Sequence, residues 1–250
     1  MAKIELIRLG DTYPLNVNKI KNFGDKSSIF EISNVSESDN PEILNRKAFI
    51  LYDQDFKYLL EKQMSADFAV IIVNRPLEDN HFSRPITEKL IVVSIFNIES
   101  LNINEGITVE MYLTRFLLAF TTIYHAYNGL KNEAYELMQK NATSCLFDFC
   151  QYKPQVSMFF RQPKLSADVV NKLEKKTLPQ NYLKSLKKEI GKLKIGIYYK
   201  LKDWFKANPI RAIILTLLFG ILFSELLGNY IYDLINDYLP FINNLTKTMK

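Results

Sequence analysis

A single charged residue within a long apolar run is the side chain of this sequence whose type and position most clearly suggest a function. Glu225 lies within residues 212–232, AIILTLLFGILFSELLGNYIY, which as a helix would span roughly 31 Å, about the hydrocarbon thickness of a bilayer. A helical projection places four candidate pore-lining side chains on the face of Glu225: Leu218, Leu222, Asn229 and Tyr232. In a symmetric oligomer this face predicts an aliphatic constriction followed by a ring of carboxylates, which favours cations. The alternative is a passive anchor in which Glu225 faces water near the membrane surface.

Small side chains recur every fourth residue along the same run. They are Ala212, Thr216, Gly220, Ser224 and Gly228. Such a stripe lets helix backbones approach closely in lipid, where small residues are enriched at helix–helix contacts. The pattern therefore predicts a helix-packing face and favours an assembly over a simple anchor.

Side chains that form catalytic or metal centres are few in this sequence. The two histidines, His81 and His125, exclude an HExxH zinc motif, and Cys145 and Cys150 are five positions apart with no second pair. We interpret the cysteines and His125 as core residues. A nucleophilic pair of His81 with a cysteine is the alternative. We expect no metal, no other cofactor and no enzymatic activity.

The positive charge is concentrated toward the C-terminus. The chain has 32 Lys and Arg against 27 Asp and Glu, of which 14 and 6 lie at or after Lys172, so residues 1–171 carry a net charge of −3. This disfavours a broad nucleic-acid-binding face on the N-terminal part. Nine basic residues lie between Lys184 and Arg211, just before the apolar run. The positive-inside rule therefore predicts a cytoplasmic N-terminal domain.

The elements that would position these residues form an α+β domain. Short runs of β-branched and aromatic residues predict strands within 1–105, and 68–73 and 90–96 are apolar enough to be buried on both faces. Helical spacing follows over 107–140, interrupted at Gly129, and again near 166–176. We predict a cytoplasmic sensor domain over 1–178, a basic connector helix over 179–208, and a single transmembrane helix with a short external tail over 209–250.

The predicted connector is an amphipathic helix with a lysine-rich face. Its apolar residues are spaced by three or four from Leu183 to Trp204, and Pro209 follows. Such a helix lies on anionic lipid or packs against copies of itself. The sequence leaves both alternatives open.

The globular part resembles a bacterial domain of metalloprotease-like ancestry. The similarity rests on FAVIIVNRPLEDNHFSR (68–84), the apolar strand and long helix after it, and CLFDFC (145–150). Gln139 and Lys140 stand where that family has a His-Glu pair, and Ser166 and Val169 stand where it has two cysteines. The resemblance therefore implies a catalytically inactive sensor without the metal ligands.

A domain of this kind fused to a C-terminal membrane helix is similar in layout to bacterial antiphage membrane effectors of the Hailong type. This similarity implies a homo-oligomer, a tetramer, in the bacterial inner (cytoplasmic) membrane. It also implies an oligodeoxyadenylate-like or other nucleotide ligand that a partner nucleotidyltransferase makes and that holds the pore shut. For such a ligand the candidate phosphate-binding residues are Arg75, Arg84, Arg115, Lys153, Arg161 and Lys164.

We therefore expect a ligand-controlled oligomeric channel of bacterial antiphage defence. Its soluble domain would sense a nucleotide or oligonucleotide and gate the transmembrane helices. Two other classes stay open: a membrane-anchored protease-like enzyme that uses His81 and a cysteine, and an adaptor tethered to the membrane.

Overall fold

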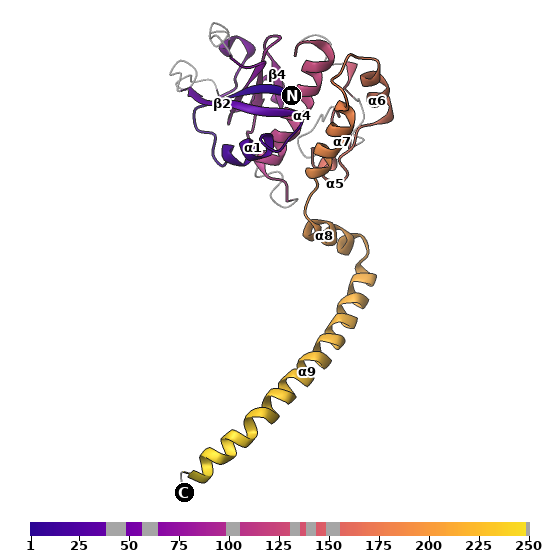
Figure 1. Cartoon of the computed structure of the whole chain (residues 1–250). Coiled ribbons are helices and arrows are strands. Elements are labelled where there is room, and N and C mark those ends of the chain that lie inside the picture. Colours follow the sequence, from indigo (N-terminus) through magenta and orange to yellow (C-terminus); the bar gives the residue numbers. More distant parts are fainter. Residues whose placement is uncertain are drawn as a thin grey trace. The chain divides into compact units, whose positions relative to one another are not determined.

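The computed structural model describes residues 1–38, 49–56, 65–98, 106–130, 136–138, 144–148 and 156–248, and side chains of the last helix as far as residue 230. The chain divides into two units, Met1–Gly196 and Ile197–Lys250. The first unit contains a sheet with helices packed against it, and the second contains helices (Figure 1).

A mostly parallel sheet forms the centre of the first unit, with its described strands in the order β2-β1-β3-β5-β4. The strands are β1 (Ala2–Leu9), β2 (Phe30–Ser38), β3 (Phe68–Val73), β4 (Ser83–Pro85) and β5 (Leu90–Ser94). Adjacent strands run parallel, except that β4 pairs antiparallel with β5. In the central register Ile4 lies opposite Phe68 and Ala69 lies opposite Leu90.

Both faces of the sheet are covered, as the apolar runs predict. Every residue of β3 and β5 is buried, which confirms the predicted strands at 68–73 and 90–96. One face packs into a core with Leu51, Phe56 and Leu77. On the other face, the helix α1 (Val17–Gly24) buries Ile20 and packs against β2. Between β3 and β5, residues 74–85 contain a 3-10 turn, Glu78–Asn80, and the edge strand β4.

The long helix α4 (Val109–Tyr127) also packs against the sheet. Its Tyr112 hydroxyl donates to the carbonyl oxygen of Ser94 at 3.1 Å, and its Tyr124 ring lies 5.3 Å from the Phe68 ring. The Thr108 hydroxyl accepts a hydrogen bond from the Met111 amide, which confirms the predicted N-cap. The helix ends before Asn128, whose φ of 54° is left-handed, one residue before the predicted break at Gly129. The second helix predicted at 132–140 lies mostly outside the described residues.

Three shorter helices complete the first unit: α5 (Val156–Arg161), α6 (Ala167–Glu174) and α7 (Tyr182–Lys192). The Ser166 hydroxyl caps α6 by accepting from the Val169 amide at 3.3 Å. This helix confirms the segment predicted near 166–176.

The continuous connector helix predicted over 181–206 is not confirmed. It is divided into α7 and α8 (Ile197–Ala207), with a break at 193–196. In the break Leu193 and Ile195 are buried, and the Ile195 amide donates to the Phe160 carbonyl oxygen at 3.1 Å. Since α7 also buries Tyr182, Leu186 and Ile190, its apolar face packs within the domain rather than on lipid or on another copy.

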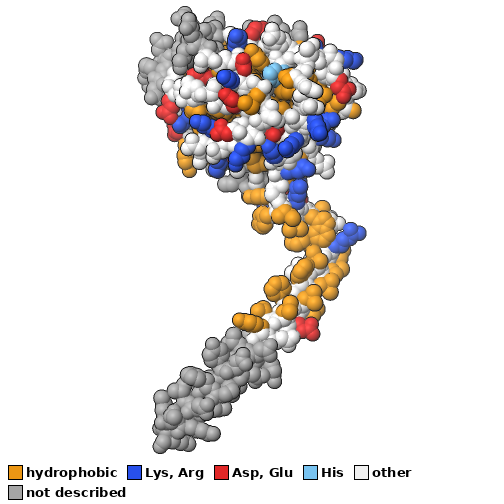
Figure 2. All heavy atoms as spheres, viewed as in Figure 1, with side chains coloured by type: hydrophobic (Ala, Val, Ile, Leu, Met, Phe, Trp, Pro, Cys, Tyr) orange, Lys and Arg blue, Asp and Glu red, His pale blue; other side chains and the backbone are white. Residues whose placement is uncertain are grey.

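The second unit consists of α8 and the long helix α9 (Pro209–Thr248). Residues Pro209–Tyr230 form a candidate membrane span with a mean hydropathy of 2.1, and none of that span is buried. Hydrophobic side chains cover the described surface of this unit (Figure 2). The protein thus combines a mixed α/β domain with one apolar C-terminal helix that is compatible with a membrane anchor.

Candidate functional site

The carboxyl ends of β1 and β3 mark the position where the strand order reverses. The chain leaves β1 for β2 on one side and later adds β3 on the other side of β1. In open α/β sheets, ligands bind outside the carboxyl ends of the strands at such a reversal. The loops after the two strands are tied together here, because the Asn74 side-chain amide donates to the Tyr13 carbonyl oxygen at 3.1 Å.

A pocket of about 640 Å³ lies beside this position, between β2, α1 and the loop before α1. Its polar lining consists of Arg8, Asn16, Asn18, Lys21, Ser33 and Asn34, and its apolar lining of Leu15, Val17, Ile32 and Val35. Two cations and three carboxamides therefore face the cavity, and no carboxylate lines it. We refer to this cavity as the α1–β2 pocket.

A β-bulge shapes the wall of the α1–β2 pocket on β2. The register shifts between Ile4 and Glu5, so Ser33 is the extra residue of β2. The Ser33 hydroxyl donates to the Ile4 carbonyl oxygen at 3.2 Å, and the Asn34 amide donates to Glu5 Oε1 at 3.2 Å. These contacts fix two of the polar side chains that line the cavity.

Arg8 is held in place from two sides. Its Nε donates to the Thr12 hydroxyl at 2.8 Å, and its guanidinium forms an ion pair with Glu37 on β2. Lys21 lies in the last turn of α1 and is exposed. Because guanidinium and ammonium groups recognise phosphate and carboxylate oxygens, this lining suits an anionic ligand with further hydrogen-bonding groups.

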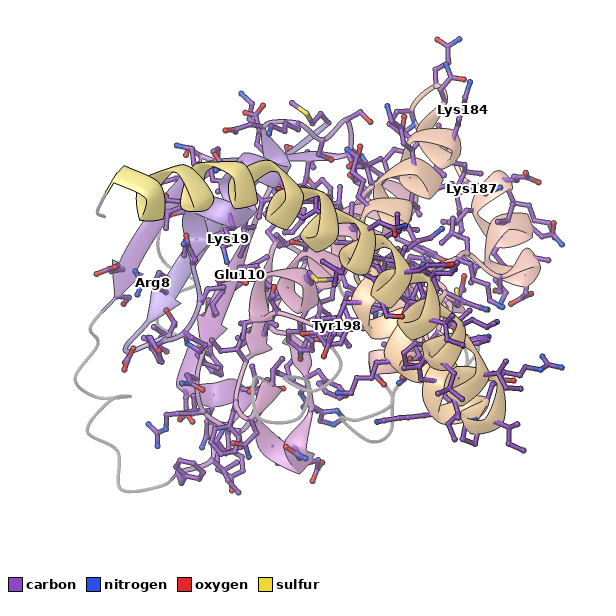
Figure 3. All side chains as sticks on the ribbon, turned by 90° about the horizontal axis from the view of Figure 1, so that it is seen from below. Arg8, Lys19, Glu110, Lys184, Lys187 and Tyr198 are labelled. Carbon is purple, nitrogen blue, oxygen red and sulfur yellow. The ribbon has the colours of Figure 1, made fainter. Side chains whose placement is uncertain are left out.

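The start of α1 is anchored by Glu110 from the first turn of α4 (Figure 3). Glu110 Oε1 accepts from the Asn16 amide at 2.9 Å, and the Lys19 ammonium lies 4.0 Å away. Burial alone would raise the pKa of the Glu110 carboxyl. The hydrogen bonds from Asn16 and Thr108 and the charge of Lys19 outweigh it and lower that pKa below its usual value. Glu110 therefore stays ionised and positions the helix that forms one wall of the pocket.

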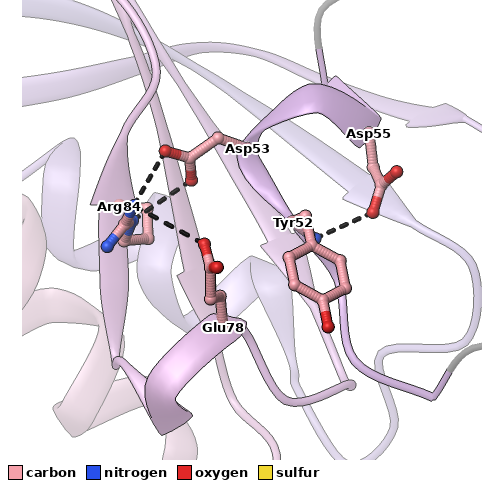
Figure 4. Close-up of polar contacts among 5 residues, drawn as sticks. All are labelled: Tyr52, Asp53, Asp55, Glu78 and Arg84. Atoms are coloured by element: carbon pink, nitrogen blue, oxygen red, sulfur yellow. Dashed lines mark hydrogen bonds and ion pairs between the residues drawn. The ribbon is translucent and has the colours of Figure 1, made fainter.

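Among the cations predicted from the sequence, Arg84 is bound by carboxylates of its own domain (Figure 4). Its Nε and Nη2 donate to the two carboxylate oxygens of Asp53 at 3.1 and 2.9 Å, and Glu78 Oε2 lies 3.9 Å from Nη2. This fork joins β4 to the 49–56 segment. Arg75, after β3, donates Nε to the Phe49 carbonyl oxygen at 3.2 Å, so it holds the same segment.

Arg115 lies inside the domain on α4 and is only 3% exposed. Its guanidinium carbon lies 5.2 Å from the Phe116 ring centre and 5.1 Å from that of Phe159, and Nη2 donates to the Asp148 carbonyl oxygen at 3.4 Å. These contacts link α4 to α5 and to residues 144–148. The Nε atom of Arg115 is buried without a hydrogen-bond partner.

The remaining predicted cations lie near the end of α5. Arg161 is the last residue of α5, and both it and Lys164 are exposed. Lys164 also pairs with Cys145 through its backbone. Lys153 lies outside the described residues. The five described cations thus lie at separate places in the fold, and the role of all six in ligand binding stays a prediction.

Among the residues considered for catalysis, His81 follows the Glu78–Asn80 turn and is half-buried, and the others are structural or lie outside the described part. Cys145 is fully buried, and its sulfur accepts from the Ser166 amide at 3.4 Å, as expected for a core cysteine. Val169 is buried in α6, and Ser166 caps that helix. Cys150, Gln139 and Lys140 lie outside the described residues. Within the described residues no group of three or more His, Cys, Asp and Glu side chains is placed to hold a metal.

One turn of α4 has two buried polar atoms without a hydrogen-bond partner among the described residues. Thr121 Oγ1 and His125 Nε2 are buried without hydrogen-bond partners, and the two residues are four positions apart. His125 packs edge-on against the Tyr124 ring of α4 and the Tyr182 ring of α7. Burial lowers the pKa of His125, the N-terminal ammonium lowers it further, and Asp67 opposes both. His125 is therefore a core histidine, as predicted, that is kept neutral.

Sequence reasoning did not identify Arg8 or Lys21. The available signal was the position of Arg8 at the carboxyl end of the first strand, two residues before Gly10. The contribution of Lys21 depends on the fold of α1 against β2, which no local pattern reveals.

The side chains predicted to line a pore or pack helices lie on α9. Leu218, Leu222, Glu225 and Asn229 are exposed, and Tyr232 lies in the part of the helix whose side chains are not described. A Cβ atom added at Gly220 or Gly228 would meet no atom within 4 Å. Thr216 and Ser224 donate their hydroxyls to carbonyl oxygens of their own helix, those of Ala212 and Ile221. The stripe thus presents small side chains with satisfied hydroxyls.

Comparison with known proteins gives a distant similarity in fold to a solved structure. No protein-family model matches the chain, and no curated protein matches it. The crystal structure of archaemetzincin from Methanopyrus kandleri matches with a TM-score of 0.48 and 12% sequence identity, over 69% of this chain and 93% of that chain. The matched structure has a metalloprotease-like fold, and membership of the Hailong-type effectors gains no support.

This finding corrects one expectation from the sequence. Because the matched structure is that of an archaemetzincin, we do not retain the expectation that the present protein has no enzymatic activity. A similarity at this level assigns no activity, metal or catalytic residue to the chain.

Proposed function

We propose that the protein is a ligand-controlled membrane channel, in which α9 helices of several copies associate and the soluble domain senses an anionic ligand. A role in bacterial antiphage defence, a tetrameric assembly and a nucleotide or oligonucleotide ligand from a partner nucleotidyltransferase belong to the same proposal. These three features rest on the resemblance drawn from the sequence.

The observation that carries the proposal is the exposed apolar surface of α9. The span Pro209–Tyr230 is 22 residues long, has a mean hydropathy of 2.1 and is not buried by any part of the chain. A surface of this size is unfavourable in water, and its length matches a bilayer. The first unit has its own buried core and does not need this helix for its fold.

The stripe on α9 supports association over simple anchoring. Gly220 and Gly228 leave open space beside the helix, so the backbone of another helix can approach there. Thr216 and Ser224 satisfy their hydroxyls within the helix, so no polar group on the stripe opposes burial in lipid or protein.

The α1–β2 pocket supports the sensing part of the proposal. Arg8 and Lys21 supply positive charge, and Asn16, Asn18 and Asn34 supply amides that donate to or accept from a base or sugar. A ligand changes the state of a channel only if it binds the open and closed forms with different affinity. The proposal therefore requires that the pocket differ between the two forms.

Membrane potential in cells that produce the full chain tests the channel. We expect depolarisation with the wild-type protein and loss of depolarisation with Gly220→Leu. A Cβ atom added at Gly220 has no atom of the chain within 4 Å, so the effect of the substitution would arise between chains. Phe219→Trp, which adds bulk about 100° around the helix from both Gly220 and Leu218, is the matched control and should leave depolarisation unchanged.

Two results would count against the channel. Equal depolarisation by wild type and Gly220→Leu would exclude packing through the stripe. A monomer in native membranes, determined by cross-linking of the intact chain, would exclude the assembly itself.

A further inference from the structure

The helix α8 (Ile197–Ala207) separates its apolar and charged side chains onto opposite faces. At about 100° per residue Tyr199 lies on the opposite side from Leu201, and the other large apolar side chains fall within roughly 60° of the direction of Leu201. These are Ile197, Tyr198, Leu201, Trp204 and Phe205. Lys200 and Lys202 lie at the two edges of this face, and Asp203 and Lys206 lie on the opposite side.

The apolar face of α8 is not covered within the chain. No residue of α8 is buried, and Ile197, Tyr198 and Leu201 are 78%, 67% and 48% exposed. The helix α7 has the same length and a similar lysine content, yet buries Tyr182, Leu186 and Ile190 in the domain. The apolar face of α7 is thus covered within its own unit, whereas the described residues of the second unit bury no residue of α8.

The end of α8 continues directly into α9. The backbone amide and side-chain amide of Asn208 both donate to the Trp204 carbonyl oxygen, at 2.9 and 3.1 Å. The Asn208 carbonyl oxygen in turn accepts from the Ala212 amide at 2.9 Å, within the first turn of α9. Since α9 and the candidate span both begin at Pro209, the single residue Asn208 separates α8 from the start of the candidate span.

We propose that α8 lies in the headgroup region of the bilayer that α9 spans, with its apolar face toward the acyl chains and its lysines on anionic headgroups. This inference rests on the proposed membrane insertion of α9. Helices that bind membrane surfaces carry large apolar side chains on one face and lysines on the other. Tryptophan and tyrosine are enriched at this depth, and lysine side chains extend from it toward phosphate groups.

Charge favours lipid over a second copy of the chain as the partner of α8. Lys200 and Lys202 flank the apolar face on both sides, so pairing two copies through this face would bring lysines close to lysines. An anionic lipid surface instead supplies the opposite charge along both edges, with each lysine worth about fivefold in affinity.

Trp204 is the only tryptophan of the chain, so its fluorescence reports α8 alone. The full chain is reconstituted into phosphatidylcholine vesicles with or without phosphatidylglycerol, and carbonate extraction establishes whether α9 is inserted. We expect blue-shifted emission, quenching by lipids brominated near the headgroup end of the acyl chain, and little quenching by iodide. The protection of Trp204 from iodide should increase with the phosphatidylglycerol content of the vesicles.

Reversal of the α8 charges tests the electrostatic part. The triple variant Lys200→Glu, Lys202→Glu, Lys206→Glu keeps Trp204. In this variant phosphatidylglycerol should no longer increase the protection of Trp204 from iodide. A matched control reverses three exposed lysines of α7, Lys184, Lys187 and Lys188, and should retain that effect. Equal phosphatidylglycerol dependence in wild type and the α8 variant would overturn the proposed lipid charge preference.

The remaining outcomes separate this inference from the proposed function. If α9 resists extraction but iodide quenches Trp204 fully, α8 lies in water and the inference fails alone. If Trp204 is protected from both iodide and brominated lipid, α8 packs against protein and the inference also fails alone. If α9 is extracted by carbonate, the proposed function and the inference fail together.

Discussion

The Tyr182 hydroxyl on α7 lies 3.1 Å from the Thr122 hydroxyl on α4. Thr122 already donates its hydrogen to the Leu118 carbonyl oxygen at 2.8 Å, so Tyr182 is the donor between the two hydroxyls. Burial raises the pKa of Tyr182, which keeps the phenol protonated and able to donate. This contact fixes the first residue of α7 to the central helix of the domain.

Tyr182→Phe should lower the free energy of unfolding by about 1 kcal/mol, because it removes one buried hydrogen bond and leaves the ring in place. The small size follows from Thr122, which keeps its bond to Leu118 in the variant. Denaturant unfolding of the full chain in detergent measures the change. Tyr198→Phe on the exposed part of α8 is the control, and an equal loss in both variants would contradict a specific role of Tyr182.

The pH dependence of stability should reveal the buried His125. Its pKa in the folded chain is below the usual value of 6.5, so below about pH 6.5 the unfolded chain binds a proton that the folded chain does not. The stability that neutral His125 contributes is therefore complete above pH 6.5 and is lost as the pH falls below it. Met1, Asp67, Tyr124 and Tyr182 provide its ionisable surroundings.

The measurement compares unfolding at about pH 7.5 and about pH 5.5 for wild type and His125→Gln. The wild type should lose more stability on acidification than the variant, which lacks the titrating group. His81→Gln is the control for the other histidine. It should lose as much stability on acidification as the wild type does. A wild-type pH dependence identical to that of His125→Gln would mean that His125 does not titrate differently on folding.

The central strands and α4 were predictable because local pattern and burial agree there. β3 and β5 are apolar at every position apart from Ser94, and such runs occur in strands covered on both faces. Thr108 and the apolar spacing after it mark the start of α4. The exposed α9 was predictable for the same reason, since length and hydropathy are local properties.

The division of the connector was not predictable from periodicity. α7 and α8 share one amphipathic pattern, and only Gly196 and the burial of Ile195 against α5 separate them. The α1–β2 pocket was missed for a related reason. Its shape depends on the bulge at Ser33 and on the strand order, which are both tertiary features.

The cations predicted to bind phosphate were identified by residue type, but their neighbours in the fold could not be predicted. Arg84 and Arg115 have the residue type that phosphate binding requires, but type does not reveal neighbours. Asp53 forms a bidentate pair with Arg84, and Phe116 and Phe159 enclose Arg115. Partners that are remote in sequence therefore determined what these side chains contact.

Lys21→Ala should weaken binding of an anionic ligand to the α1–β2 pocket by about tenfold, the usual effect of removing one hydrogen bond to a charged group. Titration calorimetry of the full chain in detergent with a short oligodeoxyadenylate measures it, and inorganic phosphate is the minimal probe. Lys26→Ala, which removes an exposed charge just beyond α1, is the control. Equal binding by Lys21→Ala and wild type would place the ligand elsewhere.

Glu225→Gln should change ion selectivity if the charge lines a pore. The substitution keeps the size of the side chain and removes the carboxylate, so a ring of acids would become a ring of neutral amides with less preference for cations. Reversal potentials of the reconstituted chain under a salt gradient measure this. We expect a shift toward the non-selective value, with assembly unchanged.

The control is Asp203→Asn, which removes one acidic charge from α8, outside the apolar span. This variant should retain the wild-type reversal potential, because Asp203 lies on α8 and not on the proposed pore-lining face of α9. A shift in Glu225→Gln alone would place that carboxylate along the ion path. An unchanged reversal potential in Glu225→Gln would instead favour an acid that faces water at the end of the span, where charged side chains are tolerated without a role in conduction.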